Sequence, residues 1–160
     1  MYTQTYNEIC TIETNIDDMN PEFYPFVMEK MMQQGAIDVF LTPIIMKKGR
    51  PGIKLTVLCK QEDEEKFSLL ILQDTSSLGV RISYQNRRTL FREMITVTTS
   101  FGEITVKIAR LAQNQPILRI TPEFEHCKKI ALQYGVPIQN VYQEALRCAE
   151  KKYSPKISNE

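Results

Sequence analysis

Two β-rich segments joined by a short loop of glycines, prolines and cations constrain the fold of this chain most. The first segment, Ala36–Met46, is almost wholly apolar. In the second, Ile53–Lys60, apolar side chains such as Leu55 and Val57 recur at every second position. That spacing is typical of a strand with one buried face. We therefore predict two strands linked by the loop Lys47–Gly52.

The segments on either side of these two strands predict an α+β fold. Apolar side chains at helical spacing predict a helix before the pair and another after it, and each helix is flanked by a further strand. The order β-α-β-β-α-β is that of a ferredoxin-like core. A β-hairpin and two C-terminal helices are predicted to follow this core. The predicted elements are strands at Glu8–Thr14, Met94–Thr99, Glu103–Arg110 and from Val80, and helices at Pro21–Gln34, Gln61–Gln73, Pro122–Tyr134 and Ile138–Lys151.

The length and composition predict one globular domain. At 160 residues the chain is long enough for one hydrophobic core. We predict a single ferredoxin-like domain over residues 1–152 and a frayed tail over residues 153–160. The net charge of +1 gives no bulk field that would attract nucleic acid or a membrane.

Sorting signals and cysteine spacing indicate a cytoplasmic protein. No apolar run is long enough to span a bilayer, and the N-terminal residues do not resemble a secretory signal. The four cysteines are widely spaced and form no CxxC pair, which favours buried free thiols in a reducing compartment. The one histidine, His126, precedes Cys127 on a predicted helix, where neighbouring side chains diverge too far to chelate one metal readily.

The loop between the two β-rich segments has the composition of a phosphate-binding loop. Lys47, Lys48 and Arg50 place three cations within four positions, and Gly49 and Gly52 permit close approach of the backbone to a ligand. The alternative is a solvated basic hairpin tip, which is common on protein surfaces.

A pair of carboxylates, Asp17 and Asp18, follows the first predicted strand. Oxygen ligands at such a junction suit Mg²⁺ or Mn²⁺, which hold a triphosphate by bridging its oxygens. The alternative is ordinary helix-start chemistry, since Asn20 and Pro21 suit a helix start by themselves and turns favour aspartate.

Hydroxyl side chains follow the second predicted helix, in the segment Asp74–Arg81. Hydroxyls such as Ser76 and Ser77, with the backbone N–H groups of the turn, can cradle an anion next to Arg81. Taken alone, the segment fits a polar helix end before a strand better.

Together the three segments resemble the C-terminal half of LarC, the nickel-insertion protein of the nickel-pincer cofactor of lactate racemase. The resemblance is carried by Ile16–Glu22, by Pro43–Gly52 and by Ser77–Arg81, and it extends from about Glu13 to Ala149. It implies a CTP-dependent nickel chelatase of the lyase class. CTP with Mg²⁺ or Mn²⁺ would cytidylylate pyridinium-3,5-bisthiocarboxylic acid mononucleotide, pyrophosphate would leave, and Ni²⁺ would enter as a substrate. The family's N-terminal half is implied as a partner.

The resemblance assigns roles to ten residues. The phosphates would be neutralised by Lys47, Lys48 and Arg50, and Mg²⁺ or Mn²⁺ would be held by Asp17 and Asp18. The backbone would approach the ligand closely at Gly49 and Gly52. Ribose, phosphate or substrate would be contacted by Ser76, Ser77 and Arg81. We expect the aspartate loop and the cationic loop to lie at opposite ends of a ferredoxin-like sheet. The sequence interpretation therefore includes a homo-oligomer in which loops of neighbouring subunits form a composite site.

Two other functions fit parts of the sequence. A ferredoxin-like RNA-binding module would interleave aromatic and basic residues on its central strands, but Ala36–Met46 has only one aromatic residue, Phe40. A non-catalytic domain that binds a nucleotide or small anion for regulation or oligomerisation is the alternative, because the predicted site contains no evident nucleophile. Pyrophosphate release from CTP distinguishes an enzyme from such a sensor.

Overall fold

The computed structural model describes residues 6–153, which form two compact units, Tyr6–Arg88 and the part of the chain that begins at Thr89. The predicted tail beyond Tyr153 lies outside the described residues. Each unit has its own buried apolar cluster. This division differs from the single domain that we predicted. Within each unit, the apolar faces of its own strands and helices bury each other.

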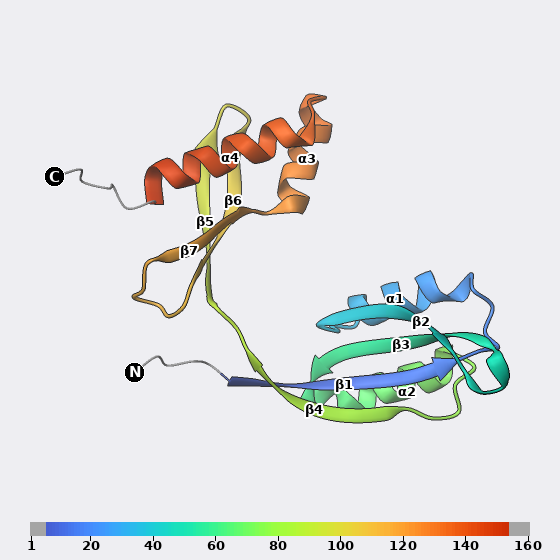
Figure 1. The fold of residues 1–160 in the computed structure, drawn as a ribbon. Helices are drawn as coiled ribbons and strands as arrows, with labels where there is room; N and C mark the ends of the chain where they lie inside the picture. Colours follow the sequence, from blue (N-terminus) through green and yellow to red (C-terminus); the bar gives the residue numbers. More distant parts are fainter. Residues whose placement is uncertain (1–5, 154–160) are drawn as a thin grey trace. The chain divides into compact units, whose positions relative to one another are not determined.

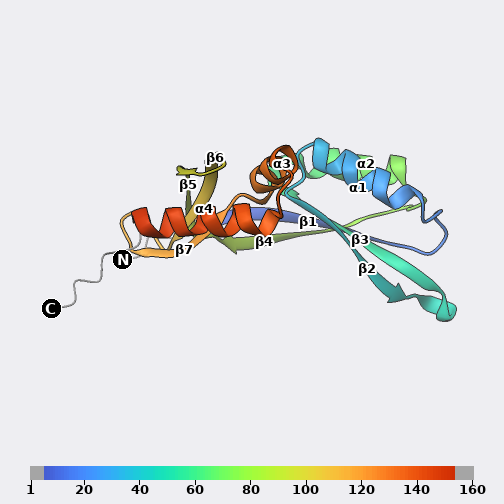
Figure 2. The ribbon, with the colours of Figure 1, turned by 90° about the horizontal axis from the view of Figure 1, so that it is seen from above.

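The first unit is a ferredoxin-like sheet covered by two helices (Figure 1). Its strands lie in the order β2-β3-β1-β4, and all neighbours are antiparallel. The helices α1 and α2 cover one face of this sheet (Figure 2). This confirms the predicted core. The elements are β1 (Tyr6–Ile16), α1 (Phe23–Gln33), β2 (Asp38–Ile45), β3 (Pro51–Lys60), α2 (Glu64–Asp74) and β4 (Arg81–Arg88), with single 3₁₀ turns at Lys47–Gly49 and Gln61–Asp63.

Alternation along the strands builds the core of the first unit. Side chains of β1 such as Ile12 face the helices together with their β3 partners such as Val57, and both are fully buried. Phe67 and Ile71 of α2 are fully buried against them. Burial of a large apolar side chain contributes about 1.5–3 kcal/mol, so these contacts dominate the stability of the unit.

Strand direction corrects the expectation that the two loops lie at opposite ends. Both β1 and β2 pair antiparallel with β3, so they run in the same direction. Ile16 at the end of β1 pairs with Ile53, and Ile45 at the end of β2 pairs with Pro51. The exit of β1 and the β2–β3 loop therefore lie at the same end of one chain. The geometry no longer requires loops from two subunits.

The second unit is a three-stranded antiparallel sheet, in the order β5-β6-β7, packed with two helices. The predicted hairpin and the two C-terminal helices are present. The strand β7 was not predicted: it includes Pro122, at which the sequence predicted the start of a helix, and α3 begins later, at Phe124. The elements are β5 (Phe91–Thr99), β6 (Gly102–Arg110), β7 (Ile117–Pro122), α3 (Phe124–Tyr134) and α4 (Ile138–Tyr153).

The cysteines lie where the sequence placed them, in or beside the cores. All four are free thiols, and Cys10, Cys59 and Cys127 are fully buried. Burial raises the pKa of Cys59 to about 12, so this thiol does not ionise near neutral pH. Within residues 6–153 no helix is long and apolar enough to cross a membrane.

Candidate functional site

Three segments that are distant in sequence meet at one end of the first unit. Arg50 of the β2–β3 loop forms an ion pair with Asp17 at the exit of β1, with its Nη1 3.3 Å from Oδ2. Ser76, in the turn between α2 and β4, donates a hydrogen bond of 2.5 Å from its Oγ to Oδ1 of Asp18. The two neighbouring aspartates are thus each held by a different segment.

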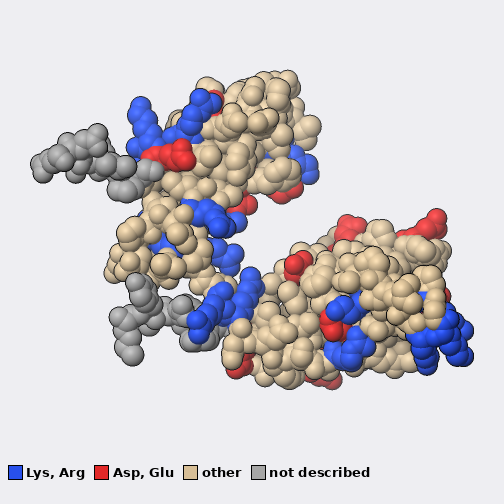
Figure 3. All heavy atoms as spheres, in the orientation of Figure 1, with Lys and Arg blue, Asp and Glu red and all other residues tan. Residues whose placement is uncertain are grey.

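The cationic loop projects its lysines into solvent. Lys47–Gly49 form a single 3₁₀ turn, and the backbone N–H of Met46 donates to the carbonyl of Arg50 at 2.8 Å to close the loop. Lys48 adopts the left-handed conformation, with a φ of 64° that is uncommon for a residue other than glycine. Within residues 6–153 neither lysine ammonium group makes a hydrogen bond or ion pair. Figure 3 shows Lys and Arg side chains gathered where this loop lies.

Gly52 is required by the close approach of the β3 start to the end of β1. A Cβ atom at this position would lie 2.8 Å from the carbonyl oxygen of Ile16 and 2.8 Å from Sδ of Met46. The first neighbour is backbone and cannot easily move. The close approach that the sequence suggested is therefore, in this structure, an approach to the neighbouring strand.

We expect Gly52→Ala to destabilise the protein by about 1–3 kcal/mol, because the added methyl group overpacks this strand contact. Urea unfolding followed by circular dichroism measures the change. Gly79→Ala is the matched control, since a Cβ atom added there would have no neighbour within 4 Å and the φ of Gly79 is not left-handed. Equal stability of the two variants would contradict this account of Gly52.

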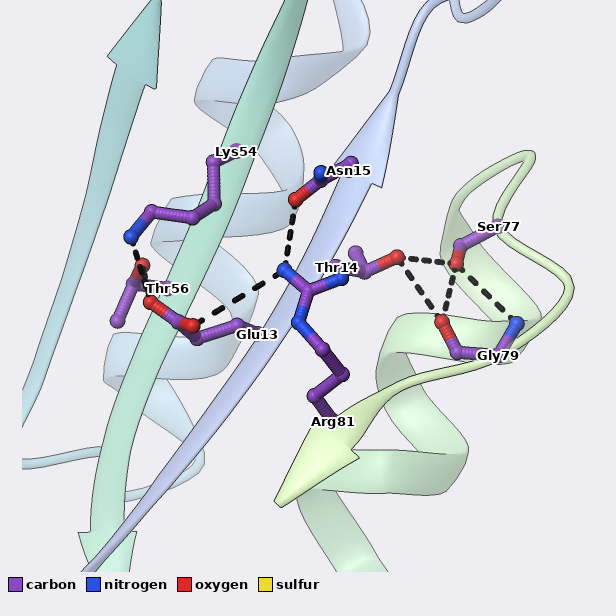
Figure 4. Close-up of polar contacts among 8 residues, drawn as sticks. All are labelled: Glu13, Thr14, Asn15, Lys54, Thr56, Ser77, Gly79 and Arg81. Carbon is purple, nitrogen blue, oxygen red and sulfur yellow. Dashed lines mark hydrogen bonds and ion pairs between the residues drawn. The ribbon is translucent and has the colours of Figure 1, made fainter. Parts of the chain in front are cut away.

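The turn after α2 is built by hydroxyl groups that bind each other (Figure 4). Thr14 of β1 contacts the Ser77 hydroxyl and donates to the carbonyl of Gly79 at 3.0 Å, and Ser77 also reaches that carbonyl at 2.8 Å. Thr14 is only 2% exposed. Ser77 is therefore occupied in holding the turn against β1. Of the two predicted serines, Ser76 is the one that reaches the aspartates.

Sequence reasoning missed Thr14. The signal that marks it is a hydroxyl residue on the apolar face of β1, in phase with Cys10 and Ile12.

Arg81 lies with a separate polar network on the sheet face that the helices leave open (Figure 4). Its Nη2 donates to Oδ1 of Asn15 at 2.7 Å and lies 3.9 Å from a carboxylate oxygen of Glu13. The other oxygen of Glu13 pairs with Lys54 Nζ at 2.7 Å and accepts a hydrogen bond from Thr56. In the described part of the chain no hydrogen bond or ion pair joins Arg81 to Asp17, Asp18 or the cationic loop.

The Lys54 ammonium group holds the pKa of Glu13 below its ordinary value. A lowered folded-state pKa stabilises the protein above the unfolded pKa, and this contribution is lost as pH falls through the folded pKa. We expect Glu13→Gln to be less stable than the unmodified protein at neutral pH, with the difference shrinking as pH falls below 4.5, the ordinary value for this group. Because Glu13 is 28% exposed, the difference is small.

Urea unfolding at a series of pH values measures the Glu13→Gln effect. Glu62→Gln is the control, because the ion pair of Glu62 with Lys60 is well exposed. A difference that grows in acid would contradict the assignment.

A pocket of about 530 Å³ lies beside the ion pair, between the start of α1 and the β2–β3 hairpin. Its wall includes Asp17 and the buried Tyr24, and its other lining residues are mainly apolar. A smaller pocket of about 300 Å³ lies on the Asp18 side and includes Phe23, Asp74 and Ser76. The sequence analysis did not single out Tyr24; its signal is a tyrosine in helical phase with Val27 and Met31.

The donor set fits a hard divalent cation bound through a ligand. Asp17 and Asp18 offer carboxylate oxygens from adjacent positions, and within residues 6–153 no group of three or more His, Cys, Asp or Glu side chains could hold a metal. Mg²⁺ and Mn²⁺ are commonly bound by one or two carboxylates together with phosphate oxygens and water. A resident nickel site, which prefers imidazole or thiolate ligands, is not formed by these residues.

The chain is similar to proteins of nickel cofactor synthesis. A model of the family described as nickel insertion protein matches residues 2–142. A pyridinium-3,5-bisthiocarboxylic acid mononucleotide nickel insertion protein of Acetivibrio thermocellus is 47% identical over 136 residues, which cover 85% of this chain and 33% of that protein. The protein of the same description from Clostridium acetobutylicum is 48% identical over 132 residues, covering 82% of this chain and 31% of that protein.

Solved structures show the same fold. LarC2, the C-terminal domain of a cyclometallase involved in the synthesis of the NPN cofactor of lactate racemase, superposes with a TM-score of 0.83 at 38% identity, covering 91% of this chain and 99% of that domain. A protein of Methanopyrus kandleri shares the fold at a TM-score of 0.69 and 21% identity. The chain spans about one third of the length of the curated relatives it matches.

Proposed function

Because the chain belongs to the nickel insertion protein family, we propose that it binds CTP with Mg²⁺ or Mn²⁺ for nickel insertion into pyridinium-3,5-bisthiocarboxylic acid mononucleotide. Ni²⁺ is a substrate of this reaction. The chain would act as a nickel chelatase of the lyase class together with the part of the relatives that it does not cover.

The observation that carries this proposal is the meeting of Asp17, Asp18 and the cationic loop at one end of one sheet. The ammonium groups of Lys47 and Lys48 have no partner within residues 6–153, so they are free to bind an anion. Charge-assisted contacts of this kind stabilise the charge that develops on a leaving pyrophosphate. Gly49, with a φ of 71°, lets the turn expose its backbone toward such a ligand.

Each residue type has a distinct part in the proposed chemistry. An acid group of the substrate attacks the α-phosphorus of CTP, the bond from that phosphorus to the β-phosphate oxygen breaks, and pyrophosphate leaves with the electron pair. Lys47 and Lys48 neutralise the β- and γ-phosphates. Asp17 and Asp18 would hold a divalent cation, which would supply positive charge to neutralise the phosphates.

The ion pair between Arg50 and Asp17 is suited to exchange. The Arg50 side chain is 59% exposed, and an exposed pair of this kind is worth only about 0–1 kcal/mol. Breaking this pair therefore requires little free energy, so Asp17 can bind a metal ion while Arg50 binds phosphate. Ser76 keeps the Asp18 carboxylate oriented during this exchange.

The site as described comes from one chain. A homo-oligomer remains a prediction, but the reason for it, loops at opposite ends of the sheet, is corrected by the strand directions. Arg81 and Ser77 are engaged elsewhere in the fold, so we assign the phosphate-binding role to the cationic loop alone.

Calorimetric titration with CTP in Mn²⁺, repeated in EDTA and with ATP in place of CTP, tests the proposal. We expect metal-dependent binding that prefers CTP, and release of pyrophosphate when the pyridinium mononucleotide is added with the rest of the protein. Binding without pyrophosphate release would favour the regulatory alternative. Binding of ATP and CTP with equal affinity would contradict the assignment of CTP.

A further inference from the structure

The pocket beside the ion pair has the size and walls of a small-molecule site. Its volume of about 530 Å³ lies within the range of about 300–1,000 Å³ usual for ligand pockets. The walls are formed mainly by apolar side chains of the β1 exit and the β2–β3 hairpin. Among them are Ile16, Met19, Pro43, Ile44, Ile45 and Ile53. Such walls suit a flat ring better than a phosphate.

Tyr24 gives this apolar pocket a polar group without a partner. It lies in the first turn of α1, lines the pocket and is only 7% exposed. Within residues 6–153 its hydroxyl makes no hydrogen bond, although buried tyrosine hydroxyls usually have one. Among residues 6–153, the side-chain oxygens that are both sealed from solvent and without a hydrogen-bond partner belong to Thr11 and Asp74, so the unpartnered Tyr24 hydroxyl is not sealed. A ligand in the pocket can therefore reach it.

The hydroxyl is a hydrogen-bond donor at neutral pH. Burial, and secondarily the negative charge of Asp18, raise the pKa of Tyr24, so it remains protonated. Asp17 itself belongs both to the pocket wall and to the ion pair with Arg50. The pocket and the proposed phosphate site therefore adjoin each other.

We propose that this pocket holds the pyridinium ring of the mononucleotide substrate and that the Tyr24 hydroxyl donates a hydrogen bond to an acid group on that ring. The inference rests on the proposed function. A pyridinium ring carries a positive charge and has no donor or acceptor atom free in the ring. Apolar walls with Asp17 and Asp18 nearby suit such a ring.

Cytosine makes different demands on a pocket. Its polar edge requires several partners, and each one left unpaired in an apolar pocket costs about 1–3 kcal/mol. Among the side chains that line the pocket, only Tyr24 and Asp17 have polar groups, which is fewer than the cytosine edge requires. A ring held here has its acid groups beside the aspartates and the cationic loop, where attack on the α-phosphorus of CTP takes place.

The test compares three ligands with the 160-residue chain. Nicotinic acid mononucleotide supplies a pyridinium ring with one carboxylate, CTP supplies cytosine with a triphosphate, and inorganic tripolyphosphate supplies phosphates without a ring. We expect Tyr24→Phe to weaken binding of nicotinic acid mononucleotide about tenfold, as for one lost hydrogen bond to a charged group. Binding of CTP and tripolyphosphate should be unchanged. Tyr84→Phe, on β4 and outside the pocket, is the control for loss of a hydroxyl.

The outcomes separate this inference from the proposed function. A larger loss for CTP than for nicotinic acid mononucleotide would overturn the inference and place the cytosine ring in the pocket. The inference would also be overturned if Tyr24→Phe weakened the binding of neither ligand. The same holds if nicotinic acid mononucleotide did not bind to the unmodified chain. In those cases a weakening of tripolyphosphate binding by Lys47→Ala still supports the phosphate site. No effect of Lys47→Ala on tripolyphosphate would instead count against the proposed function.

Discussion

Replacing Lys47 and Lys48 together by alanine is expected to weaken CTP binding on the order of a hundredfold. Each ammonium group that binds a phosphate contributes about 1.5–3 kcal/mol as a charge-assisted contact, and a tenfold change in affinity corresponds to about 1.4 kcal/mol. Both side chains are exposed and have no partner within residues 6–153, so the substitutions remove no contact of the described fold. Isothermal titration calorimetry in Mn²⁺ measures the loss.

Lys60→Ala is the matched control for this double variant. Lys60 is the last residue of β3, the strand that follows the cationic loop, and within residues 6–153 its ion-pair partner is the well-exposed Glu62. The control should bind CTP as the unmodified chain does. An unchanged affinity in the double variant would identify the loop as a solvated hairpin tip, the alternative that the sequence left open.

Asp17→Asn is expected to raise the Mn²⁺ concentration needed for half-maximal CTP binding by about tenfold or more. The substitution keeps the shape of the side chain but removes the charge that a hard divalent cation prefers. The stability of the fold should change by less than about 1 kcal/mol, because the ion pair with Arg50 is largely exposed on the arginine side. Titration of CTP binding against Mn²⁺, together with urea unfolding, measures both quantities.

Two further variants show whether the Asp17 effect is specific. Asp18→Asn tests the second carboxylate, which Ser76 holds, and Glu62→Gln removes a carboxylate from an exposed site in the same unit. Only Asp18→Asn should alter the Mn²⁺ concentration needed for CTP binding. If Asp17→Asn unfolds the protein and leaves the metal requirement of the remaining folded fraction unchanged, Asp17 is a turn residue and not a metal ligand.

The arrangement of these groups would allow one small unit to bind the proposed phosphate, metal and ring together. The cationic loop ends the β2–β3 hairpin, the aspartates follow β1, and the pocket with Tyr24 lies between them. A ligand that spans the pocket and the loop would contact all three. The weak pair of Arg50 with Asp17 at their junction leaves both side chains available to such a ligand.

Much of the fold of the first unit follows from the sequence. Alternating apolar residues such as Leu55 and Val57 predicted β3, and apolar side chains at helical spacing over Gln61–Gln73 predicted α2. In the second unit, the strand β7 was not predicted because Thr121 and Pro122 fit a helix start equally well. That ambiguity is resolved by the pairing of Pro122 with Val106 of β6, a contact distant in sequence.

The candidate site was only partly predictable. The cations, the aspartates and the hydroxyl residues were recognisable because their composition is unusual for a turn. The side chains with which these residues pair could not be predicted. Arg81 pairs with Asn15 and Glu13 on the open sheet face, and Ser77 with Thr14, because strand register and not sequence proximity brings these side chains together.

The sequence by itself determined the family and the order of the elements apart from β7, because periodicity and local motifs are properties of neighbouring residues. Only the tertiary structure decided that the exit of β1 and the β2–β3 loop share one end, since β3 runs antiparallel to both β1 and β2. It also decided that the chain forms two units, because the two sets of apolar faces close on themselves in separate cores. Both outcomes depend on long-range pairing, which no local pattern encodes.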